Sequence, residues 1–307
     1  MKLSMVIPVY NEEKSIFPLY NRLSAVLSKY KNYEIIFVDD GSRDRTFANI
    51  QILHKKDKHV KAIKFKRNFG QTAALSAGFE HANGDIIVTM DGDLQNDPED
   101  IPRLIEKINE GHDMVSGWRH KRKDSFAKKL SSSLANIARR IMLKDKIHDS
   151  GCALKAYKKE SIKDLEIYGE MHRYLPAIVA MNGYKVGEIR VNHHPRKFGK
   201  TKYSTTRIFK GLLDLFYIKF WSDYSTRPLH FFGFLGLSEI FIGLLLVIYN
   251  FIKYSTHLLI GPTLLLAVLL VITGVQFIVF GFLAEILIRT YYGANNDKGY
   301  KIEKTLK

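Results

Sequence analysis

The chain has 307 residues, enough for one large domain or two of ordinary size, and its formal net charge is +16. Its single cysteine, Cys152, excludes an internal disulfide and fits a reducing compartment. In the first 228 residues, 41 Lys and Arg outnumber 27 Asp and Glu, so we expect anionic partners there. Because no nucleic-acid-binding motif is present, lipid headgroups or phosphorylated small molecules are favoured over nucleic acid.

Short apolar segments rich in β-branched residues predict four strands near the N-terminus. They are residues 3–9, 34–38, 60–65 and 85–90. Helix-period patterns between them, as in residues 16–27 and 72–81, give a repeated strand–helix–strand order. This order predicts an α/β fold with a mostly parallel sheet covered on both faces. The first apolar run is too short for a signal peptide, so we expect this part to stay in the cytoplasm.

Polar residues follow each predicted strand. They are PVYNE at 8–12, DDGSRD at 39–44, RNFGQ at 67–71 and DGD at 91–93. Ligands of such sheets bind beyond the carboxyl ends of the strands, so the four loops are expected to form one site. Ordinary turn-forming residues account for any one of these loops taken alone. They account less well for four polar loops that each follow a strand.

The fourth loop contains a candidate metal site. Asp91 and Asp93 are two residues apart, which in an extended segment directs both carboxylates to one side, and Gly92 allows close backbone approach. Carboxylate oxygens suit Mg²⁺ or Mn²⁺, which also bind substrate phosphates. For such a pair taken alone, a surface turn is the alternative.

Other polar residues are expected to have structural roles. Asp97, Glu99 and Asp100 precede an apolar helical run and are expected to cap it. His193 and His194 have no Cys or His partner at metal-ligand spacing, so they are interpreted as surface or substrate-contact residues.

Two amphipathic stretches suit a membrane surface. Residues 119–146 hold ten Lys and Arg against two Asp, with apolar residues three to four apart. This pattern predicts a helix that lies on an anionic membrane or has a solvated face. Residues 205–223 predict a helix with a broad aromatic face ending in Trp221, suited to the headgroup region, with a core helix as the alternative.

Residues 231–252 and 263–288 contain no Lys, Arg or Asp and one Glu each. Helices of these lengths span ~33 and ~39 Å, enough for a hydrocarbon core of about 30 Å. A pair of buried helices in a soluble domain is the alternative. Basic residues flank the pair, whereas the link offers only Lys253, which predicts cytoplasmic termini. Glu285 is expected to pair with Arg289, and Glu239 suits a helix–helix or subunit contact.

The motifs PVYNE, VDDGSRD and MDGDLQNDPED, at these spacings, resemble those of the family 2 glycosyltransferases with the GT-A fold. More narrowly, they are similar to enzymes that transfer a sugar from a nucleotide to a polyprenyl phosphate, such as dolichol-phosphate mannose synthases and bactoprenol glucosyltransferases. The resemblance extends to about residue 205, and the two-span tail matches the bactoprenol branch. It implies a Rossmann-like catalytic domain over 1–204, an interfacial helix region over 205–228, two spans within 229–290 and a cytoplasmic tail over 291–307 of a cell-membrane protein.

The resemblance also implies roles for individual residues. Those that match nucleotide-sugar positions are Pro8, Tyr10, Glu12, Val38, Asp40, Asp91, Gly92, Asp93 and Gln95. Asp93 and Gln95 are the expected ligands of Mg²⁺ or Mn²⁺. The loop HPRKFGKTKYS is similar to the family's Arg-x-x-Gly-x-Ser-Lys loop, which implies phosphate contacts for Arg196 and Lys202, with Thr201 in place of the usual Ser.

Further matches concern the acceptor and the reaction. Arg119, Lys128 and Ser132 match positions near the phosphates, although Lys128 replaces an expected Arg. Asp149 matches a candidate base or sugar-contacting acid, with an Asx turn as the alternative. Asp93, the metal, Arg119 and Arg196 would stabilise the leaving diphosphate. A phosphate monoester, with a second pKa of about 6, attacks without a general base and inverts the anomeric centre.

The expected activity is therefore metal-dependent, inverting transfer of a sugar to a polyprenyl phosphate. A UDP-sugar, UDP-glucose first, is preferred to a GDP-sugar as donor, although no residue distinguishes them, and the spans could support a homo-oligomer. One alternative is a processive polysaccharide synthase, which generally has a Gln-x-x-Arg-Trp element and more spans than this sequence. The other is a non-catalytic sugar-nucleotide-binding membrane scaffold, which would not need the acidic pair, Gln95 and the basic loops together.

Overall fold

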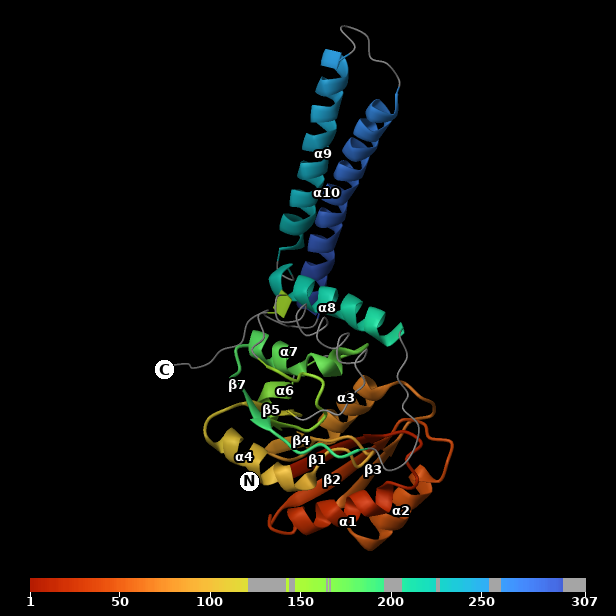
Figure 1. The fold of residues 1–307 in the computed structure, drawn as a ribbon, viewed down its shortest axis with the longest axis vertical. Coiled ribbons are helices and arrows are strands. Elements are labelled where there is room, and N and C mark those ends of the chain that lie inside the picture. Colours follow the sequence, from red (N-terminus) through yellow and green to blue (C-terminus); the bar gives the residue numbers. More distant parts are fainter. Residues whose placement is uncertain are drawn as a thin grey trace. The chain divides into compact units, whose positions relative to one another are not determined.

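The computed structural model describes residues 1–120, 142–143, 147–163, 165, 167–195, 206–224, 227–253 and 261–294 (Figure 1). The chain divides into two compact units, Met1–Tyr217 and Ile218–Lys307. The division falls inside one helix, α8 (Thr206–Tyr224). The domain boundaries expected at residues 204 and 228 stay predictions.

The first unit is built on a seven-stranded sheet with the order β3-β2-β1-β4-β6-β5-β7. The strands are β1 (Leu3–Val9), β2 (Tyr33–Asp39), β3 (Val60–Lys64), β4 (Ile86–Thr89), β5 (Met114–Trp118), β6 (Lys155–Lys158) and β7 (Val186–Arg190). β6 is antiparallel to both of its neighbours, β4 and β5, and every other pair is parallel. The expected α/β fold with a mostly parallel sheet is confirmed.

Helices cover both faces of this sheet. They are α1 (Ile16–Leu27), α2 (Thr46–Lys56), α3 (Gln71–His81), α4 (Ile101–Asn109), α6 (Lys159–Ile162) and α7 (Leu175–Met181), with short 3₁₀ turns η1 (Pro98–Asp100) and η2 (Met171–Arg173). Figure 1 shows α1, α2 and α4 on one side of the sheet and α3, α6 and α7 on the other.

The alternation of side chains along β1 explains this two-sided cover. Met5 and Ile7 are fully buried in one apolar cluster with residues of α1, α2 and α4. Val6 points to the opposite face, where a Cβ added at Gly78 of α3 would lie 2.2 Å from its Cγ1. Successive strand residues face opposite sides, so a strand buried on both faces is apolar throughout. Gly78 therefore sets the close approach of α3 to the sheet.

A buried carboxylate joins three segments at the amino-terminal edge of the sheet. Glu34 of β2 accepts hydrogen bonds from Ser4 Oγ at 2.6 Å and from Asn83 N at 2.7 Å, and it forms a 2.6 Å ion pair with Lys61 of β3. Burial alone would raise its pKa, but the bonds from Lys61, Ser4 and Asn83 outweigh burial and hold the pKa of Glu34 at about 2. The ionised carboxylate thus links β1, β2 and β3 to the loop before β4.

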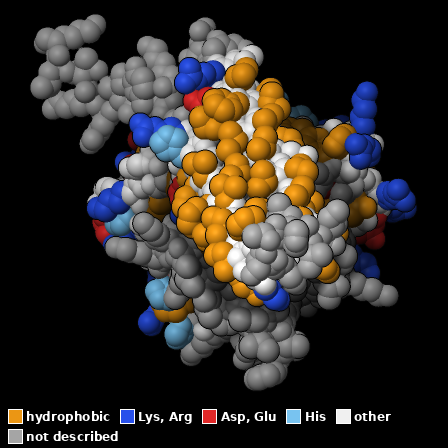
Figure 2. Space-filling model, turned by 90° about the horizontal axis from the view of Figure 1, so that it is seen from above, with side chains coloured by type: hydrophobic (Ala, Val, Ile, Leu, Met, Phe, Trp, Pro, Cys, Tyr) orange, Lys and Arg blue, Asp and Glu red, His pale blue; other side chains and the backbone are white. Residues whose placement is uncertain are grey.

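The second unit contains a pair of long apolar helices, α9 (Pro228–Lys253) and α10 (Pro262–Ala294). Their most apolar stretches reach mean hydropathies of 2.4 and 2.6, so both are long and apolar enough to cross a membrane. Figure 2 shows hydrophobic side chains gathered on the surface of this hairpin. Both expected spans lie within the observed helices.

The two helices of the hairpin approach closely through glycines and one polar contact. A Cβ on Gly236 would lie 2.4 Å from the carbonyl oxygen of Gly274, so only glycine permits this approach. Thr273 Oγ1 donates a 2.6 Å hydrogen bond to Glu239, which explains the carboxylate within the expected span. The expected pairing of Glu285 with Arg289 is confirmed at 3.0 Å.

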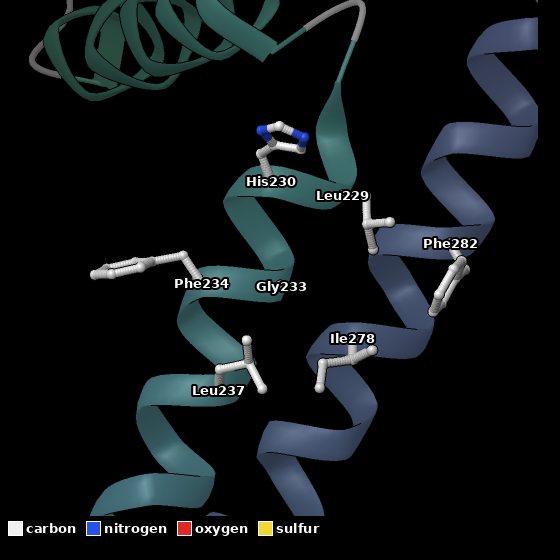
Figure 3. A pocket seen from close by; sticks show the side chains of 7 residues that line it. All are labelled: Leu229, His230, Gly233, Phe234, Leu237, Ile278 and Phe282. Carbon is white, nitrogen blue, oxygen red and sulfur yellow. The ribbon is translucent and has the colours of Figure 1, made fainter.

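An open groove lies between the first turns of α9 and the later part of α10 (Figure 3). It is lined by Leu229, His230, Gly233, Phe234, Leu237, Ile278 and Phe282. Apart from His230, the lining is apolar, which is typical of a helix surface that faces hydrocarbon.

Replacing Glu34 by Gln is expected to lower the free energy of unfolding by about 2 kcal/mol, because the ion pair is lost while the buried amide keeps fewer partners. The folded-state pKa of Glu34 is depressed from 4.5 to about 2, so its stabilising contribution is complete above pH 4.5 and is lost as the pH falls towards 2. Melting temperatures of the two proteins in detergent, measured between pH 7 and pH 3, should therefore converge at acidic pH. A constant difference would contradict this account.

Candidate functional site

The loops after β1 and β2 are joined by hydrogen bonds. Asn11, with a positive φ of 53°, donates its N–H to Ser42 Oγ at 2.9 Å, and its side-chain oxygen accepts from Arg43 N at 2.9 Å. Pro8 and Val38, both expected to contact the nucleotide, are register partners at the ends of these strands. The predicted convergence of the two loops is thus present, and it brings Pro8 and Val38 side by side.

Asp40 attaches the loop after β3 to the same edge. Its carboxylate accepts hydrogen bonds from Asn68 Nδ2 at 2.8 Å, Phe69 N at 2.7 Å and Gly70 N at 3.0 Å. The neighbouring Gly41 has a φ of +72°, and a Cβ there would lie 2.4 Å from the carbonyl carbon of Arg67. Asp40 was expected to bind the nucleotide, and in this structure it organises the third loop.

Asp39, the last residue of β2, belongs to the expected site loop 39–44 but was not singled out as a binding residue from the sequence. Its Oδ1 accepts a 3.0 Å bond from Ser42 N, whereas its fully buried Oδ2 has no hydrogen-bond partner among the residues that the structure describes. A buried acceptor without a donor is rare in folded proteins and is suited to a ligand N–H. Two consecutive aspartates after a buried strand indicated this site in the sequence. The pattern does not indicate which of the two faces a ligand.

The acidic pair lies in a turn, because β4 already ends at Thr89. Strand alternation therefore does not apply to the two carboxylates. Asp91 Oδ1 accepts a 2.8 Å bond from Gln71 Nε2 at the start of α3, and buried Asp93 accepts a 3.1 Å bond from Gln95 N. At Gly92 an added Cβ would lie 2.6 Å from Val9 Cγ1, so the turn packs directly on β1. Gly92 thus permits close packing on Val9, whereas the expected approach to a ligand stays a prediction.

The segment after β7 is fixed to this acidic turn. His194 N donates to Gln95 O at 2.8 Å, and Asn192 N donates to Asp100 Oδ2 at 2.7 Å. His194 Nε2 also lies 2.9 Å from Asp97 Oδ2. The beginning of the loop HPRKFGK is thereby held beside Asp93. Arg196 of this loop and Lys202 just after it, together with Lys128, Ser132 and most of the basic stretch 119–146, lie outside the described residues.

The expected capping roles are met in part. Asp97 accepts a 3.1 Å bond from Glu99 N at the start of η1, whereas Asp100 makes no capping bond to α4 and instead pairs with Arg103 at 2.8 Å. Burial alone would raise the pKa of Asp97, but His194 and Arg22 more than offset burial and lower it. Asp97 therefore serves as a charged link between elements as well as a cap.

Arg119 and Asp149, predicted separately, form one ion pair. Arg119 donates through Nε at 2.7 Å and through Nη2 at 2.9 Å to the two oxygens of Asp149, and both side chains are nearly buried. Glu188 of β7 accepts a 3.0 Å bond from Asp149 N and so fixes the backbone at this position. The carboxylate of Asp149 orients the guanidinium, which is a different role from that of a free base.

Lys155, the first residue of β6, is a second cation at this edge that the sequence reasoning missed. It is 3% exposed and lies close enough to Asp149, Arg119 and Asp91 to sense their charges. Burial, the largest influence, lowers the pKa of Lys155 to about 8. A lysine inside the apolar run CALKAY is unusual for a buried strand, and this was the signal that could have revealed it.

Comparison with known proteins identifies the family. Residues 4–166 match the family model described as glycosyl transferase family 2. The chain belongs to this family. It is 41% identical over 99% of its length to dodecaprenyl-phosphate galacturonate synthase of Rhizobium johnstonii, covering 93% of that protein. It is 37% identical, over 99% of its length and 90% of the relative, to undecaprenyl-phosphate 4-deoxy-4-formamido-L-arabinose transferase of Pseudomonas fluorescens.

A solved structure has the same fold. Glucosyl-3-phosphoglycerate synthase from Mycobacterium tuberculosis, in complex with Mn²⁺, uridine-diphosphate-glucose and phosphoglyceric acid, matches with a TM-score of 0.52. The match covers 70% of this chain and 79% of that one at 18% identity. The glycosyltransferase fold of the first unit is therefore shared with an enzyme of known structure.

The described residues of this glycosyltransferase fit a divalent cation that is bound together with its substrate. Among them, no group of three or more His, Cys, Asp or Glu side chains is arranged to hold a metal by itself. Asp93 offers a hard carboxylate oxygen beside Gln95, whose Nε2 is directed to His194 O at 3.4 Å. Mg²⁺ and Mn²⁺ commonly take one or two protein oxygens and complete their shell with phosphates and water. Asp93 and Gln95 suit such a partial site.

Removing one partner of the Arg119–Asp149 pair leaves a nearly buried charge unpaired. We expect Asp149→Ala to lower the free energy of unfolding by about 3 kcal/mol and to reduce sugar transfer strongly, because Arg119 is no longer oriented. The double variant Arg119→Ala/Asp149→Ala is expected to be less destabilised than the sum of the two single variants. Melting temperatures of the four proteins test this cycle, and strictly additive shifts would disprove the coupling.

Proposed function

We propose that this glycosyltransferase transfers a sugar from a nucleoside diphosphate sugar to a polyprenyl phosphate at the cytoplasmic face of a membrane. The observation that carries the proposal is the fixing of the segment 192–194 to the acidic turn, which brings the start of a basic loop beside Asp93. Anionic substrates need both a cation site and basic groups at one place. The two full-length relatives, named for dodecaprenyl and undecaprenyl phosphates, support the choice of acceptor.

The donor is proposed to lie along the carboxyl edge of β1, β2 and β4. Asp39 Oδ2 would accept an N–H of the base near Pro8 and Val38, while Asp93 and Gln95 would hold a divalent cation. When bound, the cation neutralises charge on the leaving diphosphate. The Mn²⁺ and nucleotide sugars of two solved structures with this fold, one with uridine-diphosphate-glucose and one with GDP-Man, support a metal-assisted nucleotide-sugar site.

The chemistry needs few groups from the protein. An oxygen of the lipid phosphate forms a bond to the anomeric carbon while the bond from that carbon to the diphosphate breaks, which inverts the centre. The phosphate is already ionised near neutral pH, so no general base is required. Arg119, oriented by Asp149, supplies fixed positive charge next to the reacting phosphates.

The transferred sugar is proposed to carry a polar substituent. The relatives act, by their names, on galacturonate and on 4-deoxy-4-formamido-L-arabinose. These names favour a modified sugar over the unsubstituted glucose that the bactoprenol resemblance suggests.

Membranes containing the protein, given radiolabelled nucleotide sugars, polyprenyl phosphate and Mn²⁺, should form a chloroform-soluble glycolipid that mild acid hydrolyses. We expect chelation of the metal to abolish the product and Asp93→Ala to reduce its rate by about 10²–10³-fold, because charge on the leaving group is no longer stabilised.

Asp85→Ala is the matched control for this experiment. Asp85 directly precedes β4, at the end opposite to Asp93. Its side chain is 69% exposed and, among the described residues, contacts only Met1 and Lys2, so its loss should leave the rate unchanged. Label found only in polymer would instead indicate a polysaccharide synthase. No transfer with any donor would indicate a scaffold.

A further inference from the structure

Lys155 lies on the part of the sheet that faces the start of α3. Antiparallel pairing places it directly opposite Thr89, the last residue of β4, two positions before Asp91. Because β6 runs against its neighbours, its first residue reaches the edge where the other strands end. The ammonium group is thus buried beneath the acidic turn, on a strand rather than on a loop.

The hydrogen bonding of this ammonium is incomplete. Among the described residues its only hydrogen bond is to the carbonyl oxygen of His172, at 3.4 Å, although an ammonium has three hydrogens to donate. The nearby carboxylates are engaged elsewhere, since Asp149 is held by Arg119 and Asp91 Oδ1 accepts from Gln71. A buried charge in this condition carries a large desolvation penalty unless an anion or several acceptors approach it.

The carbonyl group of His172, which accepts this hydrogen bond from Lys155, is held in place by other contacts. Thr72 Oγ1 donates to Gly169 O at 2.6 Å and lies 2.7 Å from His172 Nδ1, so the ring nitrogen must be the donor in that second bond. Ser150 Oγ also bonds to Arg173 O. These contacts fix η2 against α3, and with it the oxygen that Lys155 meets. The ammonium of Lys155 therefore has a fixed acceptor on one side.

We propose that Lys155 recognises the transferred sugar by donating hydrogen bonds to a carboxylate on it, so that the preferred donor is a nucleoside diphosphate hexuronate. This inference rests on the proposed function and names the substrate class of the same site. A carboxylate supplies both the compensating charge and up to four lone-pair positions to an ammonium that can only donate. A neutral hydroxymethyl group at the same carbon would leave the charge uncompensated.

The diphosphate of the donor is a less suitable partner for Lys155. That group is expected at the metal ligand Asp93, in the acidic turn, next to the loop that begins after His194. Lys155 lies on strand β6, opposite Thr89, and not in that loop. The proposal therefore assigns the diphosphate to the cation at Asp93 and the carboxylate of the sugar to Lys155.

The test compares a UDP-hexuronate with the UDP-hexose that differs from it only at C6, using the full-length protein in membranes with polyprenyl phosphate and Mn²⁺. In the wild type, kcat/KM should favour the hexuronate by about 10–100-fold, the range for a hydrogen bond to a charged group. In Lys155→Met that preference should disappear while transfer of the hexose persists. Lys155→Arg, which keeps the charge, should retain a preference for the hexuronate.

Lys158→Met provides the matched control, because Lys158 is on the same strand but pairs with Asp113 at 2.8 Å. Its donor preference should equal that of the wild type. Equal losses with both donors in Lys155→Met would indicate a contact to the diphosphate and overturn the inference, as would a wild type without preference. Absence of product with every donor would overturn the proposed function and this inference together.

Folding is checked independently of turnover. Melting temperatures of the wild type and Lys155→Met should be similar, since replacing a buried unpaired charge by an apolar side chain of similar length is tolerated. If Lys155→Met does not fold, Lys155→Gln replaces it. The rise in melting temperature with the hexuronate donor, relative to the hexose donor, should be lost in the variant that folds, and an unchanged rise would contradict the proposal.

Discussion

The parallel strands β1, β2, β3 and β4 end at one edge of the sheet, and hydrogen bonds between their loops hold that edge together. Asp40 is the central member, since its carboxylate binds three donors of the loop after β3 while its own loop is bonded to the loop after β1. Segments far apart in the chain thereby form one continuous surface. Each further element of the site, including the segment 192–194, is attached to this framework.

Charged side chains occupy both ends of the sheet, and apolar side chains fill the region between them. At the amino-terminal edge Glu34 is compensated by Lys61 and by two hydrogen bonds. At the carboxyl edge, Arg119 is compensated by Asp149, whereas Lys155 is compensated incompletely. A protein tolerates an incompletely compensated buried charge where a bound ligand supplies the missing charge or hydrogen bonds. The difference between the two edges separates the structural end of the domain from the functional one.

Local patterns in the sequence were sufficient for the first four strands, the sheet type and the apolar hairpin, because each depends on neighbouring residues. They did not predict β5, β6 and β7, and they placed the acidic pair on an extended segment where the structure has a turn. They were insufficient for the pairing of Arg119 with Asp149 and for the place of Lys155. Both depend on β6 lying between β4 and β5, and strand order is determined by contacts between distant segments that periodicity does not report. The same limit applies to Asp39 and Asp40, where only the packed loops show which carboxylate is left with an open oxygen.

The reversed direction of β6 has a consequence for how donor selectivity can change among related enzymes. Loops adapt their conformation, and ordering them on a ligand has an entropic cost. A strand residue such as Lys155 is already ordered by the fold, so its recognition of a ligand adds no such cost. A single substitution at this position can therefore exchange one sugar for another while the sheet, the turn at Gly92 and the acceptor machinery stay the same.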